Sequence, residues 1–445
     1  MEVPPPRSRK VQAVWIAGIV WLTAASVYVC LLTYQRIDAY LFPGNELSIP
    51  NLPAYVPGTN IGTDVSLPGI SSPDKRPWTP REHLNILVMG LDRRPWESPD
   101  EPSRSDTMFI ASIDKASGRV QLLALPRDLW ANVPASDQPG DWGAAKINAA
   151  YAYGQLYGYP GGGPAAAVAA VEYNYHIDIH HYVVIDWVGF VRLIDALGGI
   201  DIVVPEAVSD FSTDTLQPFE NNTVQPGEQH MNGEQALAYS RVRVDGDLKR
   251  IERQQLVIKA AARRALSLGL VPRLPDLWSS YRDAILTDID TGLIPGFALL
   301  ARNLDLENIE SFSLGPAVYP GIADDGALIL LPNFDEVYAI IDTFLADPRL
   351  RDEAPQIVVQ YTPGAADSAE QVRAHLAGYG VPPQWVTLVE GDGLEPGIYN
   401  LTGKTYTAGK LHDLLDLPDG QLNGGPQPTG DVVIQVAGPV KLKSP

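Results

Sequence analysis

Cysteine is almost absent from this chain of 445 residues, because Cys30 is the only one. A single cysteine excludes an intramolecular disulfide framework and any zinc site built from cysteine ligands. Basic residues are also scarce, since 33 Lys and Arg stand against 53 Asp and Glu and give a formal net charge of −20. A chain this acidic is unsuited to general binding of nucleic acid. Hydrophobic residues make up 45% of the sequence, which excludes wholesale disorder.

Long apolar runs are rare too, and the one at residues 13–33 has no charged side chain. A helix of that length covers about 30 Å, the thickness of a bilayer core. Arg7, Arg9 and Lys10 precede it, so its amino end should be cytoplasmic. A cleaved signal peptide or a buried core helix are the alternatives, but a signal peptide usually has a shorter apolar core. We expect a cytoplasmic tail at 1–12, a transmembrane helix at 13–33 and an extracellular linker rich in Pro and Gly at 34–82.

Apolar runs typical of buried strands alternate with helical patterns from residue 84 onward. Strands are expected at 84–92, 107–114, 120–126, 181–186 and 200–205, and helices at 146–158, 164–176, 187–198 and 249–268. This alternation predicts an α/β sheet with helices on its faces. Residues 270–350 are expected to complete this domain and connect it to the next. The same alternation returns on a smaller scale at 356–438, with three strands and two helices, and predicts a second, compact α/β module.

Two carboxylates are expected to meet at one edge of the first sheet. Asp92 ends a buried strand, and Asp106 begins the next strand beside Arg104. Two acids placed this way suit a hard cation such as Mg²⁺, which takes one or two carboxylates and completes its shell with phosphate oxygens. An ordinary salt-bridged turn is the alternative interpretation.

Basic side chains follow in two further segments. Arg127 stands just beyond a strand, where ligands gather in open α/β sheets. Lys146 is expected to open a helix, whose amino end also favours anions.

The densest basic segment lies at 241–255. Arg241 and Arg243 alternate as in a strand, so both should face one side. On the helix that follows, Asp247, Arg250 and Gln254 share one face, whereas Arg253 is rotated away from it. Guanidinium groups match phosphate oxygens in bidentate geometry, which favours a site for a pyrophosphate and a metal. A solvated helix with pairs at i,i+3 spacing is the alternative.

Other constellations are weaker. His176, His180 and His181 have a spacing seen at metal sites, but they precede and begin a strand between tyrosines, which favours packing. The sequence has no G-x-S-x-G nucleophile elbow, so a Ser-His-Asp hydrolase is poorly supported.

Seven motifs in this order resemble the LytR-CpsA-Psr (LCP) family and cover about residues 84–265. They are NILVMGLD, RSDTM, LPRDL, KINAAYAYG, HYVVIDWVGFVRLIDALGGIDIVVP, MNGEQALAYSRVR and DLKRIERQQ. The resemblance implies a three-layer α/β/α LCP catalytic domain with a mixed central sheet at 83–350. Residues 355–438 are similar to the LytR C-terminal domain that accompanies some family members.

The resemblance also implies an activity and a site. Family members transfer a glycopolymer from a polyprenyl-pyrophosphate carrier to peptidoglycan, commonly with Mg²⁺ or Mn²⁺. By motif, Asp92 and Asp106 match the metal-associated acids. The residues implied to bind pyrophosphate are Arg127, Lys146, Arg241, Arg243, Asp247, Arg250 and Gln254, to which we add Arg104. We expect Asp92, Asp106, Arg127 and Arg250 to be catalytic. Ala124-Leu125 and the short spacer between Arg243 and Asp247 depart from the family pattern, and the spacer should alter the rim where the glycan enters.

Two other functions remain open at this point. Attack by water would make the protein a polyprenyl-pyrophosphate pyrophosphatase, whereas binding without chemistry would make it a lipid-binding envelope regulator. Direct contact with DNA conflicts with the expected topology, because only about twelve residues precede the span. The presence of both Asp92 and Asp106 favours a membrane-anchored phosphotransferase whose bulk lies outside the cell.

Overall fold

The computed structural model describes residues 83–443 apart from short gaps at 95, 99–100, 115–116, 210–218, 220–221, 268–284, 294–299, 301–303, 392–394 and 422–428. The predicted tail, transmembrane helix and linker at 1–82 lie outside the described residues. Within the described part of the chain, no helix is both long enough and apolar enough to cross a membrane.

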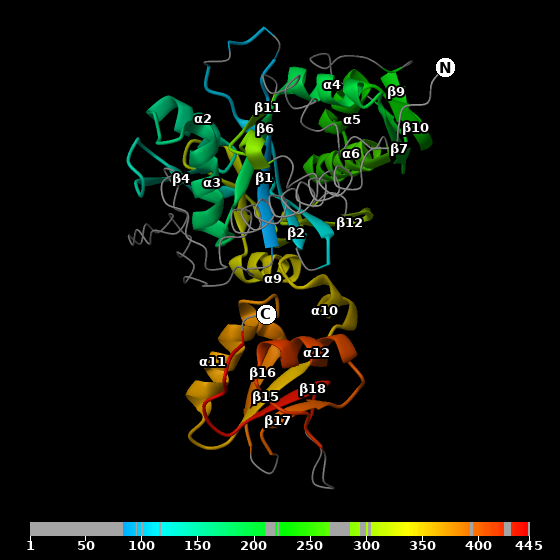
Figure 1. Ribbon diagram of the computed structural model, residues 1–445. Helices are drawn as coiled ribbons and strands as arrows, with labels where there is room; N and C mark the ends of the chain where they lie inside the picture. Colours follow the sequence, from blue (N-terminus) through cyan, green and yellow to red (C-terminus); the bar gives the residue numbers. More distant parts are fainter. Residues whose placement is uncertain are drawn as a thin grey trace, which may run out of the picture.

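A six-stranded mixed sheet forms the centre of the larger part, in the order β11-β6-β1-β2-β3-β12 (Figure 1). Strands β1, β3, β6 and β12 point the same way, and β2 and β11 run against them. The bounds are β1 (His83–Leu91), β2 (Ser105–Asp114), β3 (Arg119–Ala124), β6 (His181–Ile185), β11 (Ile285–Thr287) and β12 (Asp305–Ser313). The mixed α/β fold is as predicted, but β12 was not expected as a strand of this sheet.

Helices pack on both faces of this sheet, because its strands alternate apolar side chains between the two sides. Leu87 and Met89 of β1 join one core with three helices, and Val88 between them packs on the opposite side. The first face carries α2 (Ala149–Tyr157), α3 (Gly162–Tyr175) and α9 (Phe334–Phe344), and the second carries α6 (Asp247–Ser267). Layers of helix, sheet and helix therefore enclose the strands.

A third core lies beside α6 and outside the central sheet. The predicted strand at 200–205 is present as β7, but it pairs with β10 rather than with the central sheet. This region contains α4 (Trp187–Ala196), β7 (Ile200–Val204), β8 (Val208–Ser209), β9 (Thr223–Val224), β10 (Gly227–Met231) and α5 (Gly233–Arg241). Helix α4 ends before Gly198 and Gly199, whose φ angles of 72° and 86° favour glycine and stop the helix as expected.

Two hairpins complete the larger part. One is formed by β4 (Trp130–Pro134) and β5 (Trp142–Lys146), and the other by β13 (Val318–Ile322) and β14 (Leu328–Pro332). The helix predicted from residue 146 begins only at Ala149, because Lys146 pairs with Trp130 as the last residue of β5.

A second, smaller mixed sheet has the order β16-β15-β18-β17 and its own apolar core. Its elements are β15 (Ile357–Tyr361), α11 (Ala366–Ala377), β16 (Val386–Glu390), β17 (Gly397–Asn400), α12 (Thr405–Leu414) and β18 (Val432–Val436). The three strands and two helices expected here are all present, and β17 is an additional strand. The resemblance of this part to a LytR C-terminal domain stays a prediction.

Helix α10 (Pro348–Glu353) connects the two parts through polar contacts. The carboxylate of Glu353 accepts hydrogen bonds from the backbone N–H groups of Tyr406 and Thr407 at the start of α12, at 2.9 and 2.8 Å. Just before α10, the fully buried Asp347 pairs with Lys410 of α12 at 2.7 Å. The smaller sheet is therefore attached to the larger part by charged side chains as well as by the chain itself.

The amino end of β1 lies at the edge of the central sheet that faces this connection. His83 is 1% exposed, and its Nδ1 lies 2.7 Å from Ser112 Oγ. Burial lowers the pKa of His83 to about 4, despite the opposing charges of Asp114 and Asp347. Strand β1 then runs away from α10 toward the opposite edge, where the polar residues singled out in the sequence lie.

Candidate active site

The candidate site lies at the edge of the central sheet where the parallel strands end. Strand β2 begins there, because Leu91 at the end of β1 pairs with Ser105 at the start of β2. Asp92 follows β1, Asp106 is the second residue of β2, and Arg127 lies three residues beyond β3. The two acids are therefore on neighbouring strands at one edge, as the sequence predicted.

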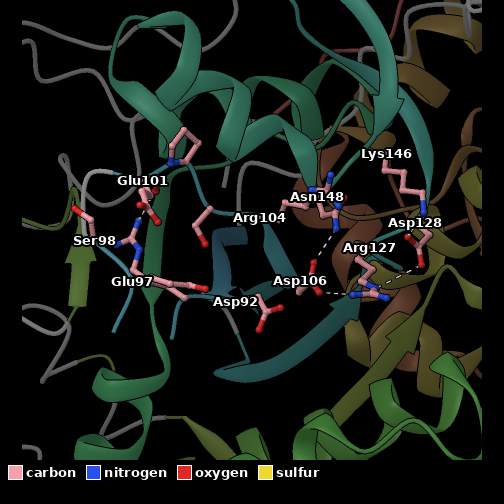
Figure 2. Close-up of a pocket in the computed structure, with 13 residues that line it drawn as sticks. Asp92, Glu97, Ser98, Glu101, Arg104, Asp106, Arg127, Asp128, Lys146 and Asn148 are labelled. Carbon is pink, nitrogen blue, oxygen red and sulfur yellow. Dashed lines mark hydrogen bonds and ion pairs between the residues drawn. The ribbon is translucent and has the colours of Figure 1, made fainter. Parts of the chain in front are cut away.

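Three side chains hold Asp106 by both of its carboxylate oxygens. Asn148 Nδ2 donates to Oδ1 at 2.8 Å and Arg127 pairs with Oδ2 (Figure 2). Arg243 also pairs with Oδ2, at 3.3 Å. Burial would raise the pKa of Asp106, but the charge of Arg127, the hydrogen bond from Asn148 and the charge of Arg243 outweigh it. The pKa therefore lies below its usual value, and Asp106 is ionised.

Asp92 is held more loosely, by Arg241 alone among the ion pairs of the described residues, at 3.3 Å from Nη2 to Oδ1. The guanidinium of Arg241 also lies 3.5 Å from the centre of the Trp187 ring, at the start of α4. Burial lowers the pKa of Arg241 despite the nearby charge of Asp92. Its Nη1 is buried and has no hydrogen-bond partner among the described residues, so this group is available to an anion.

The two arginines at 241 and 243 reach the site by a different route from the one predicted. Arg241 is the last residue of helix α5, and Arg243 lies in the turn before α6, so they do not alternate along a strand. The polar helix start at Asn232, with a complete capping box to Gln235, explains why this segment is helical. Both side chains still reach the paired acids, Arg241 at Asp92 and Arg243 at Asp106.

Helix α6 presents the face predicted from its spacing. Arg250 is 3% exposed and pairs with Asp247 at 2.7 Å, and burial lowers its pKa to about 10. Gln254, one turn on, donates to Thr107 Oγ1 at 3.0 Å and so ties the helix to β2. Arg253 points elsewhere, as expected, and forms two hydrogen bonds of 2.6 and 2.8 Å with Asp245.

Lys146 and Arg127 are linked through Asp128. Lys146 Nζ lies 2.8 Å from one oxygen of Asp128, and Arg127 Nε lies 3.4 Å from the other (Figure 2). Lys146 was expected at the amino end of a helix, but it ends β5 and reaches the site from a hairpin. Arg104 is exposed and borders the same cavity as Lys146.

Two cavities meet at Asp92 and Asp106, which border both of them. The first has a volume of about 480 Å³ and polar walls that include Arg93, Glu97, Glu101, Arg104 and Lys146. The second, of about 120 Å³, lies between the sheet and helices α4, α5 and α6 and has apolar walls that include Val88, Trp187, Phe190, Leu237 and Val257. Arg241, Arg243 and Arg250 also border this apolar cavity. The charged groups therefore stand where a polar space joins an apolar one.

The donor set suits a divalent cation shared with a phosphate ligand. Asp92 and Asp106 border one cavity, and Asp106 is ionised, as a hard cation requires. Among the described residues, no three His, Cys, Asp or Glu side chains converge as a metal-binding group. Phosphate oxygens or waters would therefore have to complete the coordination of an ion held here.

Sequence reasoning missed three residues of this site: Asn148, Asp128 and Trp187. Each stands within or beside a quoted motif, but the sequence does not indicate which neighbour its side chain contacts. The three histidines agree with the packing interpretation. His176 stacks on Tyr338 with ring centres 6.0 Å apart, His180 accepts a hydrogen bond from the N–H of Asn85, and His181 lies 3.3 Å from Asp288.

Comparison with known proteins places this arrangement in a family. The chain is 32% identical over 237 residues to the polyisoprenyl-teichoic acid–peptidoglycan teichoic acid transferase TagU of Oceanobacillus iheyensis, over 52% of this chain and 68% of that protein. It is 30% identical over 262 residues to the Biofilm regulatory protein A of Streptococcus mutans, over 58% of this chain and 59% of that protein.

A crystal structure of a Streptococcus agalactiae protein matches 59% of this chain and 88% of its own, with a TM-score of 0.50 and 27% identity. The LytR_cpsA_psr family model matches residues 64–337 and thus ends before the smaller sheet. Because that match spans more than half of the sequence and includes every residue of the two cavities, the chain belongs to the LytR-CpsA-Psr family.

Proposed function

We propose that this protein is a membrane-anchored phosphotransferase that moves a glycopolymer from a polyprenyl-pyrophosphate carrier to peptidoglycan. The observation that carries the proposal is the meeting of a polar and an apolar cavity at two carboxylates surrounded by arginines. A lipid pyrophosphate has the same division, with an apolar chain on one side of its phosphates and a glycan on the other. The printed name of the Oceanobacillus iheyensis relative, a teichoic acid transferase acting on peptidoglycan, supports the same reaction class.

The arginines supply the charge that a pyrophosphate needs. Arg241 Nη1 and Arg250 Nε are buried N–H groups without a hydrogen-bond partner among the described residues. A buried donor left unpaired costs about 1–3 kcal/mol, so both groups gain when a phosphate oxygen accepts from them. Arg127 and Lys146 already face carboxylates and would turn part of their donors to the same anion. The polyprenyl chain would lie between the sheet and helices α4, α5 and α6.

The two acids would then have different roles. Both oxygens of Asp106 are occupied, and its side chain is 14% exposed. Among the described residues, Asp92 has a single ion pair, which involves one of its two oxygens. Its side chain is 36% exposed. Asp92 is therefore the better acceptor for a proton from an incoming sugar hydroxyl. Asp106 serves as a fixed negative charge.

The reaction follows from these positions. The acceptor hydroxyl oxygen attacks the phosphorus that carries the glycan, and its proton passes to Asp92. The bond from that phosphorus to the bridging oxygen breaks, and polyprenyl phosphate leaves with the electron pair. Asp92 and Asp106 would hold a Mg²⁺ or Mn²⁺ ion, which supplies charge neutralisation at the phosphate oxygens when bound. The remaining stabilisation comes from prepositioned arginines, as is usual in phosphoryl transfer.

The cellular setting rests on the sequence. The apolar run at 13–33 and the basic residues before it favour a single anchor with the catalytic part outside the cell. That orientation puts the proposed site in the compartment that contains peptidoglycan.

The test is transfer by the full-length chain in detergent, with a polyprenyl-pyrophosphate saccharide and purified peptidoglycan. We expect polyprenyl phosphate and peptidoglycan-linked saccharide to form in equal amounts, and only when acceptor is present. Release of free saccharide phosphate at the same rate without acceptor would identify a pyrophosphatase instead. Tight lipid binding without any product would identify a lipid-binding regulator.

A further inference from the structure

Asn148 stands at the start of a helix and does not cap it. An Asn in this position normally accepts a hydrogen bond from a backbone N–H of the first turn. Asn232 does so at the start of α5, where its side chain accepts from the N–H of Gln235 at 2.9 Å. Asn148 precedes α2 with helical backbone angles, and its side chain caps no N–H group of the described helix. It turns instead to Asp106 and donates from Nδ2 to Oδ1 at 2.8 Å.

The backbone of Asn148 is fixed to the two segments that carry the charged pair. Its carbonyl oxygen accepts from the N–H of Ser105, the residue before Asp106, at 3.2 Å. Its own N–H donates to the carbonyl oxygen of Arg127 at 3.3 Å. The residue is 3% exposed, so the amide group can neither swing out nor be replaced freely by water. Asn148 is therefore a rigid support for the contact between Asp106 and Arg127.

The amide oxygen of Asn148 makes this orientation of the side chain energetically costly. Asn148 Oδ1 is buried and has no hydrogen-bond partner within the residues described. A side chain that only stabilised α2 would use this oxygen to cap the helix, as Asn232 does. Its orientation instead satisfies Asp106, which points to a role in the site rather than in the helix.

We propose that Asn148 is a positioning residue that fixes the carboxylate plane of Asp106, and with it the direction in which Asp106 faces a divalent cation and a phosphate. This inference rests on the proposed phosphotransferase function. Rotation about the last bond of an Asp side chain is soft, and the arginines hold only one of its two oxygens. Asn148 holds the other oxygen and thereby prevents that rotation.

The other side chains that pair with Asp106 hold it at its second oxygen. Arg127 and Arg243 both contact Oδ2, so neither replaces the contact that Asn148 makes at Oδ1. Loss of the amide hydrogen bond therefore frees the carboxylate to turn, which should weaken the binding of a cation held by Asp92 and Asp106.

The experiment compares Asn148→Ala with Asn232→Ala, which also removes an Asn before a helix but lies outside both cavities. Two properties of the full-length chain in detergent are measured: the affinity for Mn²⁺ by electron paramagnetic resonance with inorganic pyrophosphate present, and kcat and KM of transfer. For Asn148→Ala we expect the Mn²⁺ affinity to fall about 10–100-fold, as for other partners of metal-binding side chains. We expect kcat to fall as well, with KM near the wild-type value. Asn232→Ala should change the melting temperature but neither of these properties.

The two measurements separate failure of this inference from failure of the proposed function. An unchanged Mn²⁺ affinity in Asn148→Ala, or a wild-type chain that binds no Mn²⁺, would overturn the positioning role, whatever the protein catalyses. Weakened Mn²⁺ binding, relative to a wild-type chain that transfers nothing, would support the role of Asn148 and count against the phosphotransferase. If Asn148→Ala fails to fold, Asn148→Ser, whose hydroxyl is too short to take the place of the amide N–H at Asp106, gives the same comparison.

Discussion

The guanidinium group of Arg241 lies 3.5 Å from the centre of the Trp187 ring while its Nη2 donates to Asp92. The ring covers one face of the guanidinium, and the carboxylate occupies one edge. The other edge, with Nη1, is left for an anion. One aromatic side chain thus sets the direction in which this arginine presents its charge, and it does so from the wall of the apolar cavity.

Replacing Trp187 with Leu should remove the ring that covers the Arg241 guanidinium, while an apolar side chain stays in the cavity wall. The expected loss is about 1–2 kcal/mol of affinity for a polyprenyl pyrophosphate, the range for a partly buried cation–π contact. Trp187→Phe should retain part of that affinity. Trp385→Leu makes the same change against the core of the smaller sheet and should leave affinity unchanged. Equal losses in Trp187→Leu and Trp385→Leu would mean that general destabilisation explains the effect.

Removing single arginines of the site should weaken lipid binding strongly. Arg127→Ala, Arg241→Ala and Arg250→Ala are each expected to cost roughly 2–5 kcal/mol, because neighbouring buried charges lose their partner. Lys in place of Arg should restore only part of the affinity, since a point charge does not reproduce the bidentate fork. Binding is measured at fixed salt on variants whose melting curves show a folded protein.

Arg373 provides the matched control for the arginine series. It is half-exposed on α11, a helix beside the smaller sheet, and pairs with Glu370 at 2.6 Å. Arg373→Ala removes the same charge far from both cavities and should leave binding as it is. Weakening comparable to that of Arg250→Ala would show that net charge alone governs the affinity.

The proposed cation site predicts that loss of either of its two acids weakens metal binding. Asp92→Ala and Asp106→Ala should each reduce Mn²⁺ affinity, measured by electron paramagnetic resonance with inorganic pyrophosphate present, by at least about tenfold, since even outer-shell partners cost that much. Asp367→Ala, an exposed acid on α11, is the control. Mn²⁺ binding that survives both substitutions would remove the metal role of these acids.

Acid should destabilise the folded chain through His83. Its pKa is lowered from 6.5 to about 4 by burial, so the unfolded chain binds more protons between these values. The stabilisation linked to neutral His83 is thus complete above pH 6.5 and is lost as the pH falls toward 4. Over this pH range, the melting temperature of His83→Gln should depend less on pH than that of the wild-type protein. A slope unchanged by His83→Gln would show that other groups cause the acid sensitivity.

The sequence predicted best those contacts of the site that follow from strand order or from helical spacing. Asp92 follows β1 and Asp106 is the second residue of β2, its antiparallel neighbour, so their convergence follows from strand order alone. The face shared by Asp247, Arg250 and Gln254 follows from helical spacing, once α6 is recognised as a helix.

Other contacts depend on tertiary pairing that no local pattern encodes. Lys146 ends a strand because β5 pairs with β4, although its sequence, WGAAK, has no β-branched residue. The sequence of β12 lacks regular alternation, and its pairing with β3 is interrupted between Asp305 and Glu310. The contact between Asn148 and Asp106 joins residues 42 positions apart through a rotamer choice, which the sequence does not reveal.

The direction of β1 has a consequence for how far the protein can work from its point of attachment. The chain enters β1 at His83, beside α10, and leaves it next to Asp92, so nine residues carry it about 30 Å from one edge of the sheet to the other. If residues 13–33 anchor the chain, residues 34–82 must bridge the gap between bilayer and His83. Those 49 residues span at most about 160–175 Å when extended. Under the proposed function, the length of this tether, rather than the orientation of the sheet, would set the depth of wall within which an acceptor hydroxyl is reachable, and shortening it would restrict transfer to the glycan strands nearest the bilayer.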